Sequence, residues 1–209
     1  MSLIGQGETI DDINGVKLLG YFETIKGTFI TKWVLLLHFL DDQAHLAPVR
    51  FQQAVIANLQ GQFPFDLAYT ALCNGNQELV ENYKEDIVTS AIIGVWSVFE
   101  QLTKDLPNPN YAHNPDDASV NYQRNDFGFT VAEKRSLDVI YYVRNAIVHY
   151  NGAYYAYRDI DRHYAGMHFL SVGHHGEKIE ISPTLTWQMI RDVEAFTIKA
   201  WRNYKVLHP

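Results

Sequence analysis

Apolar side chains recur every three or four positions through residues 77–106, a spacing that predicts one long amphipathic helix. Pro107 and Pro109 end this helix, because proline lacks the backbone N–H that a continuing helix requires. The same spacing predicts helices over residues 16–40 and from about residue 183 to about residue 206. Helices with one apolar face bury that face by packing against one another, which favours a helical bundle.

A further helix with clear end signals is predicted from Thr130 to about Tyr150. Thr130 followed by Glu133 is the pattern of a capping box, in which each side chain bonds the other residue's backbone N–H. Asn151 and Gly152 are typical of a helix that ends in the left-handed conformation. The apolar stripe of this helix is predicted to consist of Leu137, Ile140, Val143 (or Arg144), Ile147 and Tyr150.

The remaining segments predict shorter elements. Residues 48–61 and 66–72 are expected to be helical. Residues 107–130 are rich in proline, asparagine and aspartate, and we interpret them as a functional or partly disordered loop. Strand-like runs at 167–172 and 178–182 flank a Gly-His-His-Gly turn and predict a β-hairpin.

These patterns together predict an all-α fold class, a bundle of about five to six helices with a small β-hairpin before the C-terminal helix. Residues 1–15 are interpreted as a polar N-terminal lead-in, and residues 16–209 as a single helical domain. Apolar residues make up 47% of the chain, so a core can form without disulfides or a metal.

Charge and cysteine content narrow the classes of function. A formal net charge of −7 argues against broad attachment to nucleic acid, which needs many phosphate contacts. A local site stays compatible, because residues 121–163 hold six basic and five acidic side chains. Cys73 is the single cysteine, which fits a reducing compartment. Since no apolar run approaches the length of a membrane span and no signal peptide is indicated, we expect a soluble cytoplasmic protein without a membrane partner.

The best candidates for catalytic residues lie in the segment that runs from Arg144 through Asn145 to His149, near the predicted helix end. Asn145 and His149 are four residues apart and therefore share one helix face. Histidine titrates near neutrality and can move the protons that RNA cleavage requires. A guanidinium can stabilise the negative charge that builds up on the phosphate oxygens.

This Arg-Asn-x-x-x-His segment resembles the signature of the HEPN superfamily (higher eukaryotes and prokaryotes nucleotide-binding domain), in which a histidine follows an arginine by a short spacer. A polar residue often follows the arginine in that family, and Asn145 matches. Residues 92–100 also resemble the family's partner helix, so the resemblance covers roughly residues 77–205. It implies a helical bundle and RNA cleavage without a metal or cofactor, leaving a 2′,3′-cyclic phosphate.

On this resemblance, Arg144 and His149 are the catalytic pair, Asn145 supports them, and Glu100 on the partner helix holds Arg144. Tyr150 is included as a supporting residue; some members place a tyrosine two positions after the histidine, where this chain has Asn151. The implied partners are an RNA substrate, a second copy that completes a composite active site, and an antitoxin or other regulatory protein. The implied setting is a toxin–antitoxin, abortive-infection or other defence system.

Other interpretations of the same residues stay open. Arg144 can serve only as a bridge to Glu100, with His149 as an ordinary helix-end residue, in a non-catalytic module that binds a nucleotide or a protein. Residues 158–163 repeat the Arg-x4-His spacing, but Asp159 and Asp161 would repel a phosphate. A histidine cluster at His163, His168, His174 and His175 lacks metal-ligand spacing. Several tyrosines between residues 141 and 157 fit helix packing better than base stacking.

Overall fold

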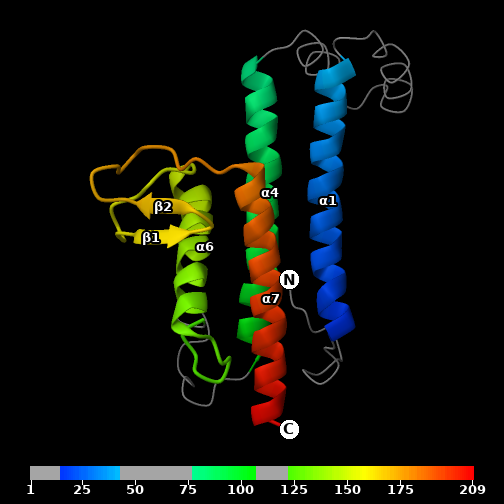
Figure 1. The fold of residues 1–209 in the computed structure, drawn as a ribbon, viewed down its shortest axis with the longest axis vertical. Helices are drawn as coiled ribbons and strands as arrows, with labels where there is room; N and C mark the ends of the chain where they lie inside the picture. Colours follow the sequence, from blue (N-terminus) through cyan, green and yellow to red (C-terminus); the bar gives the residue numbers. More distant parts are fainter. Residues whose placement is uncertain (1–14, 43–76, 107–121) are drawn as a thin grey trace. The chain divides into compact units, whose positions relative to one another are not determined.

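The computed structural model describes residues 15–42, 77–106 and 122–209 (Figure 1). In chain order its elements are helix α1 (Gly15–Asp42), helix α4 (Gln77–Asp105), helix α6 (Val131–Tyr150), strand β1 (Asp161–Tyr164), strand β2 (Met167–Leu170) and helix α7 (Pro183–Leu207). The mostly helical class is confirmed, but the described residues contain four helices, fewer than the five to six predicted. The helices expected at residues 48–61 and 66–72, and Cys73, lie outside the described residues.

The described chain divides into two compact units. One comprises Met1–Lys26 and Thr89–Pro209, and the other comprises Gly27–Val88, so α1 and α4 each contribute to both. In the second unit the buried apolar side chains are those of Phe29, Leu36, Val80, Ile87 and Val88. All of the candidate functional residues belong to the first unit.

The core of the first unit forms where α4, α6 and α7 bury their apolar stripes. The Trp96 ring lies 5.2 Å from Phe99 and 5.5 Å from Tyr141, which joins α4 to α6. Phe129, just before α6, lies 5.9 Å from Phe196 on α7. Side chains that are at most 1% exposed include Ile92, Val95, Leu102, Leu137, Ile140, Val143, Met189, Ile190 and Val193.

The ends of α6 agree with the prediction. Thr130 Oγ1 accepts a hydrogen bond from the Glu133 N–H at 3.2 Å, and Glu133 Oε2 accepts one from the Thr130 N–H at 2.6 Å. At the other end Asn151 has φ 52°, the left-handed conformation. The predicted apolar stripe is only partly buried, because Ile147 is half-buried and Tyr150 is exposed. The last turn of α6 therefore extends beyond the core.

The β-hairpin differs from the one predicted. It pairs Asp161–Tyr164 with Met167–Leu170 in antiparallel register, and Tyr164 lies opposite Met167. Its two-residue turn has positive φ at Ala165 and at Gly166, as a type I′ turn requires. Residues 178–182 are not the partner strand, and Lys178 forms only an isolated bridge with Ala153. The prediction failed because alanine is an unusual first residue for such a turn, whereas the Gly-His-His-Gly segment was a stronger signal.

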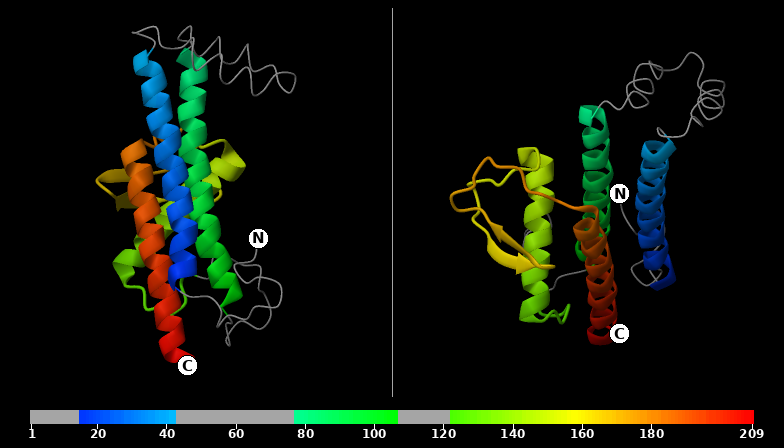
Figure 2. Two further views of the ribbon diagram at one scale, coloured as in Figure 1. Left: turned by 90° about the vertical axis from the view of Figure 1, so that its right-hand side faces the viewer. Right: turned by 45° about the horizontal axis from the view of Figure 1, so that its top comes forward.

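The hairpin lies beside α6 and is fixed to α7 as well (Figures 1 and 2). The Tyr164 hydroxyl donates a hydrogen bond to Asp192 Oδ2 on α7 at 2.8 Å. Burial and the contact with Asp192 raise the pKa of Tyr164. The segment that connects the end of α6 to β1 is therefore held in place by the helix at one end and by the hairpin at the other. This segment forms part of the candidate site.

Among the described helices, none combines the length and the apolar character that a membrane span requires.

Candidate functional site

Arg144 points from α6 toward α4. Its Nη2 atom lies 3.7 Å from Glu100 Oε2, and the two side chains are 22% and 20% exposed. Its Nη1 atom donates a hydrogen bond to Asn145 Oδ1 at 2.7 Å. Its Nε is buried and has no hydrogen-bond partner among the described residues. Glu100 thus lies next to Arg144, and the distance between the two side chains is longer than a hydrogen bond.

Arg124 is held more tightly than Arg144. The Arg124 side chain, 4% exposed, donates hydrogen bonds to Asp126 and to the Leu106 carbonyl oxygen. It also lies over the Phe127 ring, 4.3 Å from the ring centroid. A guanidinium has five N–H donors, and those of Arg124 are largely used by structural contacts. Within the described residues Arg144 makes one hydrogen bond and one long ion pair.

His149 lies in the last turn of α6 and its side chain is exposed. Among the described residues it has no hydrogen bond or ion pair, and its ring lies nearly perpendicular to that of Tyr150 with centroids 6.3 Å apart. A histidine in this position can exchange protons with a ligand from solvent. The alternative role as a helix-end residue is compatible with the same placement.

Three tyrosine rings stack directly beside His149. The Tyr155 ring lies between Tyr142 and Tyr150, at 4.3 Å and 8° from the first and 4.3 Å and 10° from the second. Tyr142, Ala146 and Tyr150 form one row on α6 at four-residue spacing, and the small buried side chain of Ala146 leaves room for the inserted ring. Tyr155 is 5% exposed, whereas Tyr150 is 41% exposed.

The tyrosine stack lies next to predicted site residues. Asn145, which accepts the hydrogen bond from Arg144, lies close enough to Tyr155 to influence the pKa of its hydroxyl. Tyr155 stacks on Tyr150, and Tyr150 touches His149. Burial and the nearby Tyr142 raise the pKa of Tyr155, so its hydroxyl stays protonated near neutral pH. Glu100, Arg144 and Asn145 thus form one set of contacts, and His149 and Tyr150 form a second one with Tyr155.

Tyr155 is the member of this set that the sequence analysis missed. On α6 a small residue, Ala146, lies between two aromatic residues, Tyr142 and Tyr150. This pattern is the sequence signal that another ring can insert between the two tyrosines. Nothing in the sequence identifies Tyr155 rather than Tyr154 or Tyr157 as the inserted residue. The turn at Asn151 and Gly152 decides this, because the Gly152 N–H bonds the Ala146 carbonyl oxygen at 2.9 Å and reverses the chain.

We predict that Tyr142→Phe lowers the free energy of unfolding by about 1–3 kcal/mol. The Tyr142 hydroxyl accepts a hydrogen bond from the Tyr155 N–H at 3.0 Å and donates one to the Tyr155 carbonyl oxygen at 3.2 Å. Removing it leaves both buried backbone groups without that partner. Urea unfolding measures the change, and Tyr157→Phe is the control because Tyr157 is 91% exposed. Equal stability of the two variants would contradict this prediction.

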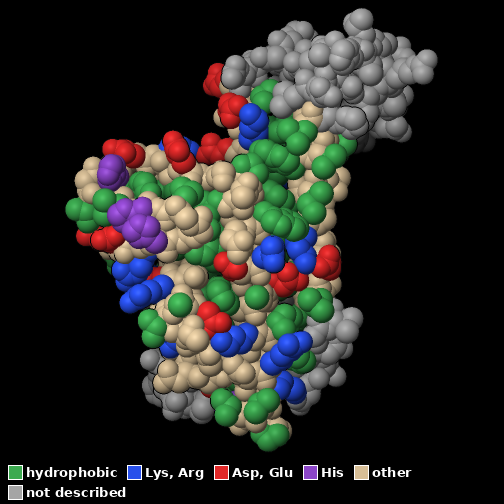
Figure 3. All heavy atoms as spheres, in the orientation of Figure 1, with side chains coloured by type: hydrophobic (Ala, Val, Ile, Leu, Met, Phe, Trp, Pro, Cys, Tyr) green, Lys and Arg blue, Asp and Glu red, His purple; other side chains and the backbone are tan. Residues whose placement is uncertain are grey.

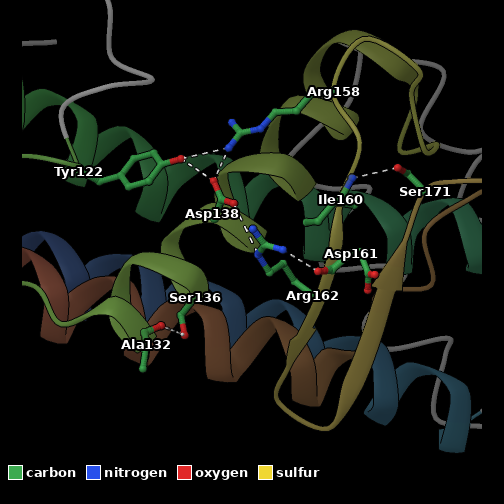
Figure 4. A network of polar contacts seen from close by, with 9 residues as sticks. All are labelled: Tyr122, Ala132, Ser136, Asp138, Arg158, Ile160, Asp161, Arg162 and Ser171. Carbon is green, nitrogen blue, oxygen red and sulfur yellow. Dashed lines mark hydrogen bonds and ion pairs between the residues drawn. The ribbon is translucent and has the colours of Figure 1, made fainter.

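A second polar network, also missed, centres on Asp138 of α6. In Figure 4 the side chains of Tyr122, Arg158 and Arg162 converge on its carboxylate. The Tyr122 hydroxyl donates to Asp138 Oδ1 at 2.6 Å, and Arg158 pairs with the same oxygen. Arg162 lies 4.0 Å from Oδ2. Burial and the hydrogen bond to Asp138 raise the pKa of Tyr122. We interpret this network as structural, because it anchors the segment before β1 to α6.

This network also bears on the second Arg-x4-His match, Arg158 to His163. Arg158 is engaged by Asp138 and lies over the Tyr141 ring at 5.5 Å. His163 stacks on His168 across the hairpin, with centroids 4.2 Å apart. The two members of this match therefore have partners of their own, unlike His149.

The histidine cluster gathers over the hairpin (Figure 3). Three of its four members pair with carboxylates: His168 with Asp161 at 2.7 Å, His174 with Glu177 at 2.9 Å and His175 with Asp159 at 3.1 Å. The hydrogen bond from His168 lowers the pKa of Asp161. Within the part of the chain that the structure describes, no three or more histidine, cysteine or acidic side chains form a group that could hold a metal ion.

The geometry around the end of α6 offers one exposed imidazole, one guanidinium with unused donors and one exposed aromatic ring. These groups suit an anionic ligand that also has planar, unpaired bases. Comparisons of the chain with models of protein families, with curated proteins and with solved structures gave no match.

Proposed function

We propose that this protein is a metal-independent endoribonuclease of the HEPN type, with Arg144 and His149 as its catalytic pair. The observation that supports this most strongly is the contrast between His149 and three of the histidines in and after the described hairpin, His168, His174 and His175. His149 is exposed at a helix end without a carboxylate partner, whereas His168, His174 and His175 are paired. A proton-transfer group must be open to its substrate in this way.

In the proposed reaction, the ribose 2′-oxygen attacks the adjacent phosphorus. The 2′-hydroxyl proton passes to a base, the new 2′-oxygen–phosphorus bond closes a 2′,3′-cyclic phosphate, and the bond from phosphorus to the 5′-oxygen breaks. The departing 5′-oxygen takes a proton from an acid, so no oxidant, metal or cofactor is consumed. His149 supplies one of these proton transfers, and the unused N–H donors of Arg144 stabilise the charge on the phosphate oxygens.

The reaction needs two proton transfers, and each chain offers one exposed histidine in the motif. We therefore propose a homodimer in which two α6 ends meet and form a composite cleft. The exposed apolar side chain of Val148, 43% exposed, precedes His149 and suits partial burial in such an assembly. A toxin, abortive-infection or other defence role, restrained by an antitoxin or other regulatory protein in the cytoplasm, fits an enzyme of this kind.

A second candidate function is a non-catalytic interaction module with the same bundle. The ion pair between Arg144 and Glu100 favours it, because an arginine that bridges two helices needs no substrate to explain it. The net charge of −7 also disfavours a large RNA-binding surface. This alternative predicts a folded protein, self-associated or bound to a partner, that never cleaves RNA.

RNA cleavage in EDTA separates the two candidates. We expect the wild-type protein to cleave single-stranded RNA equally well in excess EDTA and in magnesium, because the proposed groups are all side chains of the chain. The measurement is the rate of loss of a labelled RNA, with heat-denatured protein as the blank. Intact RNA under both conditions, from protein that is folded by circular dichroism, would refute the nuclease and favour the interaction module.

A further inference from the structure

The stack of three tyrosine rings at the end of α6 ends in Tyr150, the most exposed of the three. Tyr142, at the inner end, is 1% exposed, and Tyr155, in the middle, is 5% exposed. Tyr150, at the outer end, is 41% exposed although Tyr155 covers one of its faces at 4.3 Å. Tyr150 is therefore accessible to solvent although Tyr155 covers one face of its ring.

We infer that the open face of Tyr150 is a stacking platform for an unpaired nucleobase of the RNA that His149 and Arg144 act on. This inference rests on the proposed function and names a substrate subsite within it. A nucleobase would extend the row of parallel rings by one member. Stacking on an aromatic face is tolerant of base identity, so the platform would favour single-stranded RNA without selecting a sequence.

The platform is rigid, which favours it over an ordinary exposed tyrosine. Tyr155 supports Tyr150 from behind, and both backbone groups of Tyr155 are bonded to the Tyr142 hydroxyl. Little side-chain entropy is lost when a ligand binds such a preorganised ring. Tyr157 offers the contrast, because it is 91% exposed and no ring among the described residues stacks on it.

The groups around the platform fit a nucleotide rather than an apolar protein segment. The rings of His149 and Tyr150 lie nearly perpendicular to each other, with centroids 6.3 Å apart. A base on Tyr150 would leave its ribose and phosphate near the imidazole of His149. Such a placement would position the 2′-hydroxyl beside a proton-transfer group.

The test is binding of a single-stranded 2′-O-methyl RNA that contains one 2-aminopurine, since this probe has no free 2′-hydroxyl and cannot be cleaved by the proposed route. The variants are Tyr150→Leu, which keeps an apolar cover for Tyr155 but has no aromatic face, and Tyr150→Phe, which keeps the ring. Tyr157→Leu is the matched control. We expect wild type and Tyr150→Phe to quench the probe, and Tyr150→Leu to bind about tenfold more weakly with the quenching lost. Tyr157→Leu should behave as wild type.

Three results would overturn the inference: no binding by the wild type, equal weakening by Tyr150→Leu and Tyr157→Leu, or unchanged binding by Tyr150→Leu. If unchanged binding came with weaker self-association in sedimentation, the ring would be assigned to a protein contact instead. Failure of the proposed function can be distinguished from failure of this inference. Tyr150-dependent probe binding without RNA cleavage would refute the nuclease alone, and RNA cleavage in EDTA that is indifferent to Tyr150→Leu would refute the platform alone.

Discussion

His149→Ala is expected to lower the rate of RNA cleavage by about 10²-fold or more, the usual contribution of a proton-transfer residue. His149 is exposed and makes no hydrogen bond or ion pair among the described residues, so the substitution should leave stability almost unchanged. Single-turnover cleavage of a labelled RNA in EDTA measures the loss, and thermal unfolding verifies that the fold is intact.

His163→Ala is the matched control for this variant. His163 is an exposed histidine at the end of the second Arg-x4-His match, and it stacks on His168 rather than facing an open site. We expect it to cleave RNA like the wild type. Equal activity of His149→Ala and wild type would show that His149 has no part in the chemistry. A loss of activity in His163→Ala alone would instead indicate that the catalytic site lies at the hairpin.

Arg144→Ala should lower RNA cleavage by about 10²- to 10³-fold, as the loss of a group that stabilises transition-state charge does. Its cost in unfolding free energy should be small, about 1 kcal/mol, because the ion pair to Glu100 is long and partly exposed. Glu100 also keeps Lys104 at 3.1 Å, so it is not left without a cation. A large loss of activity with a small loss of stability separates a catalytic arginine from a bridging one.

Arg135→Ala removes the same charge from the same helix and serves as the control. Arg135 is exposed in the first half of α6, away from the helix end that holds His149. We expect this variant to cleave RNA at the wild-type rate. If Arg144→Ala instead unfolded the protein while leaving the activity of the folded fraction intact, the bridge to Glu100 would be the whole role of this residue.

The helices were largely predictable from the sequence because their signals are local. The capping box at Thr130 and Glu133, and the turn at Asn151, fix both ends of α6 within a few residues of chain. Pro183 opens α7 in the same way, with Ser182 as its N-cap. Such signals depend on backbone groups that are close in sequence, so no tertiary information is needed.

The parts that were missed depend on contacts between distant segments. The insertion of Tyr155 between Tyr142 and Tyr150 requires the chain to reverse after α6, and the ion pairs of Asp138 with Arg158 and Arg162 require β1 to lie beside that helix. The motif spacing predicted which side chains lie near the end of α6. It did not predict the tyrosine stack beside His149, because neighbours across space leave no fixed interval in a sequence.

The most direct measurement is the chemistry of the cleaved ends. An RNA oligonucleotide with one 2′-deoxy nucleotide at a mapped cleavage position is incubated with the protein in EDTA, and the products are identified by mass spectrometry. We expect 2′,3′-cyclic phosphate and 5′-hydroxyl ends at every cut, no cut at the deoxy position, and almost no products with His149→Ala. Products with 3′-hydroxyl and 5′-phosphate ends, or cleavage at the deoxy position, would contradict 2′-oxygen attack assisted by Arg144 and His149.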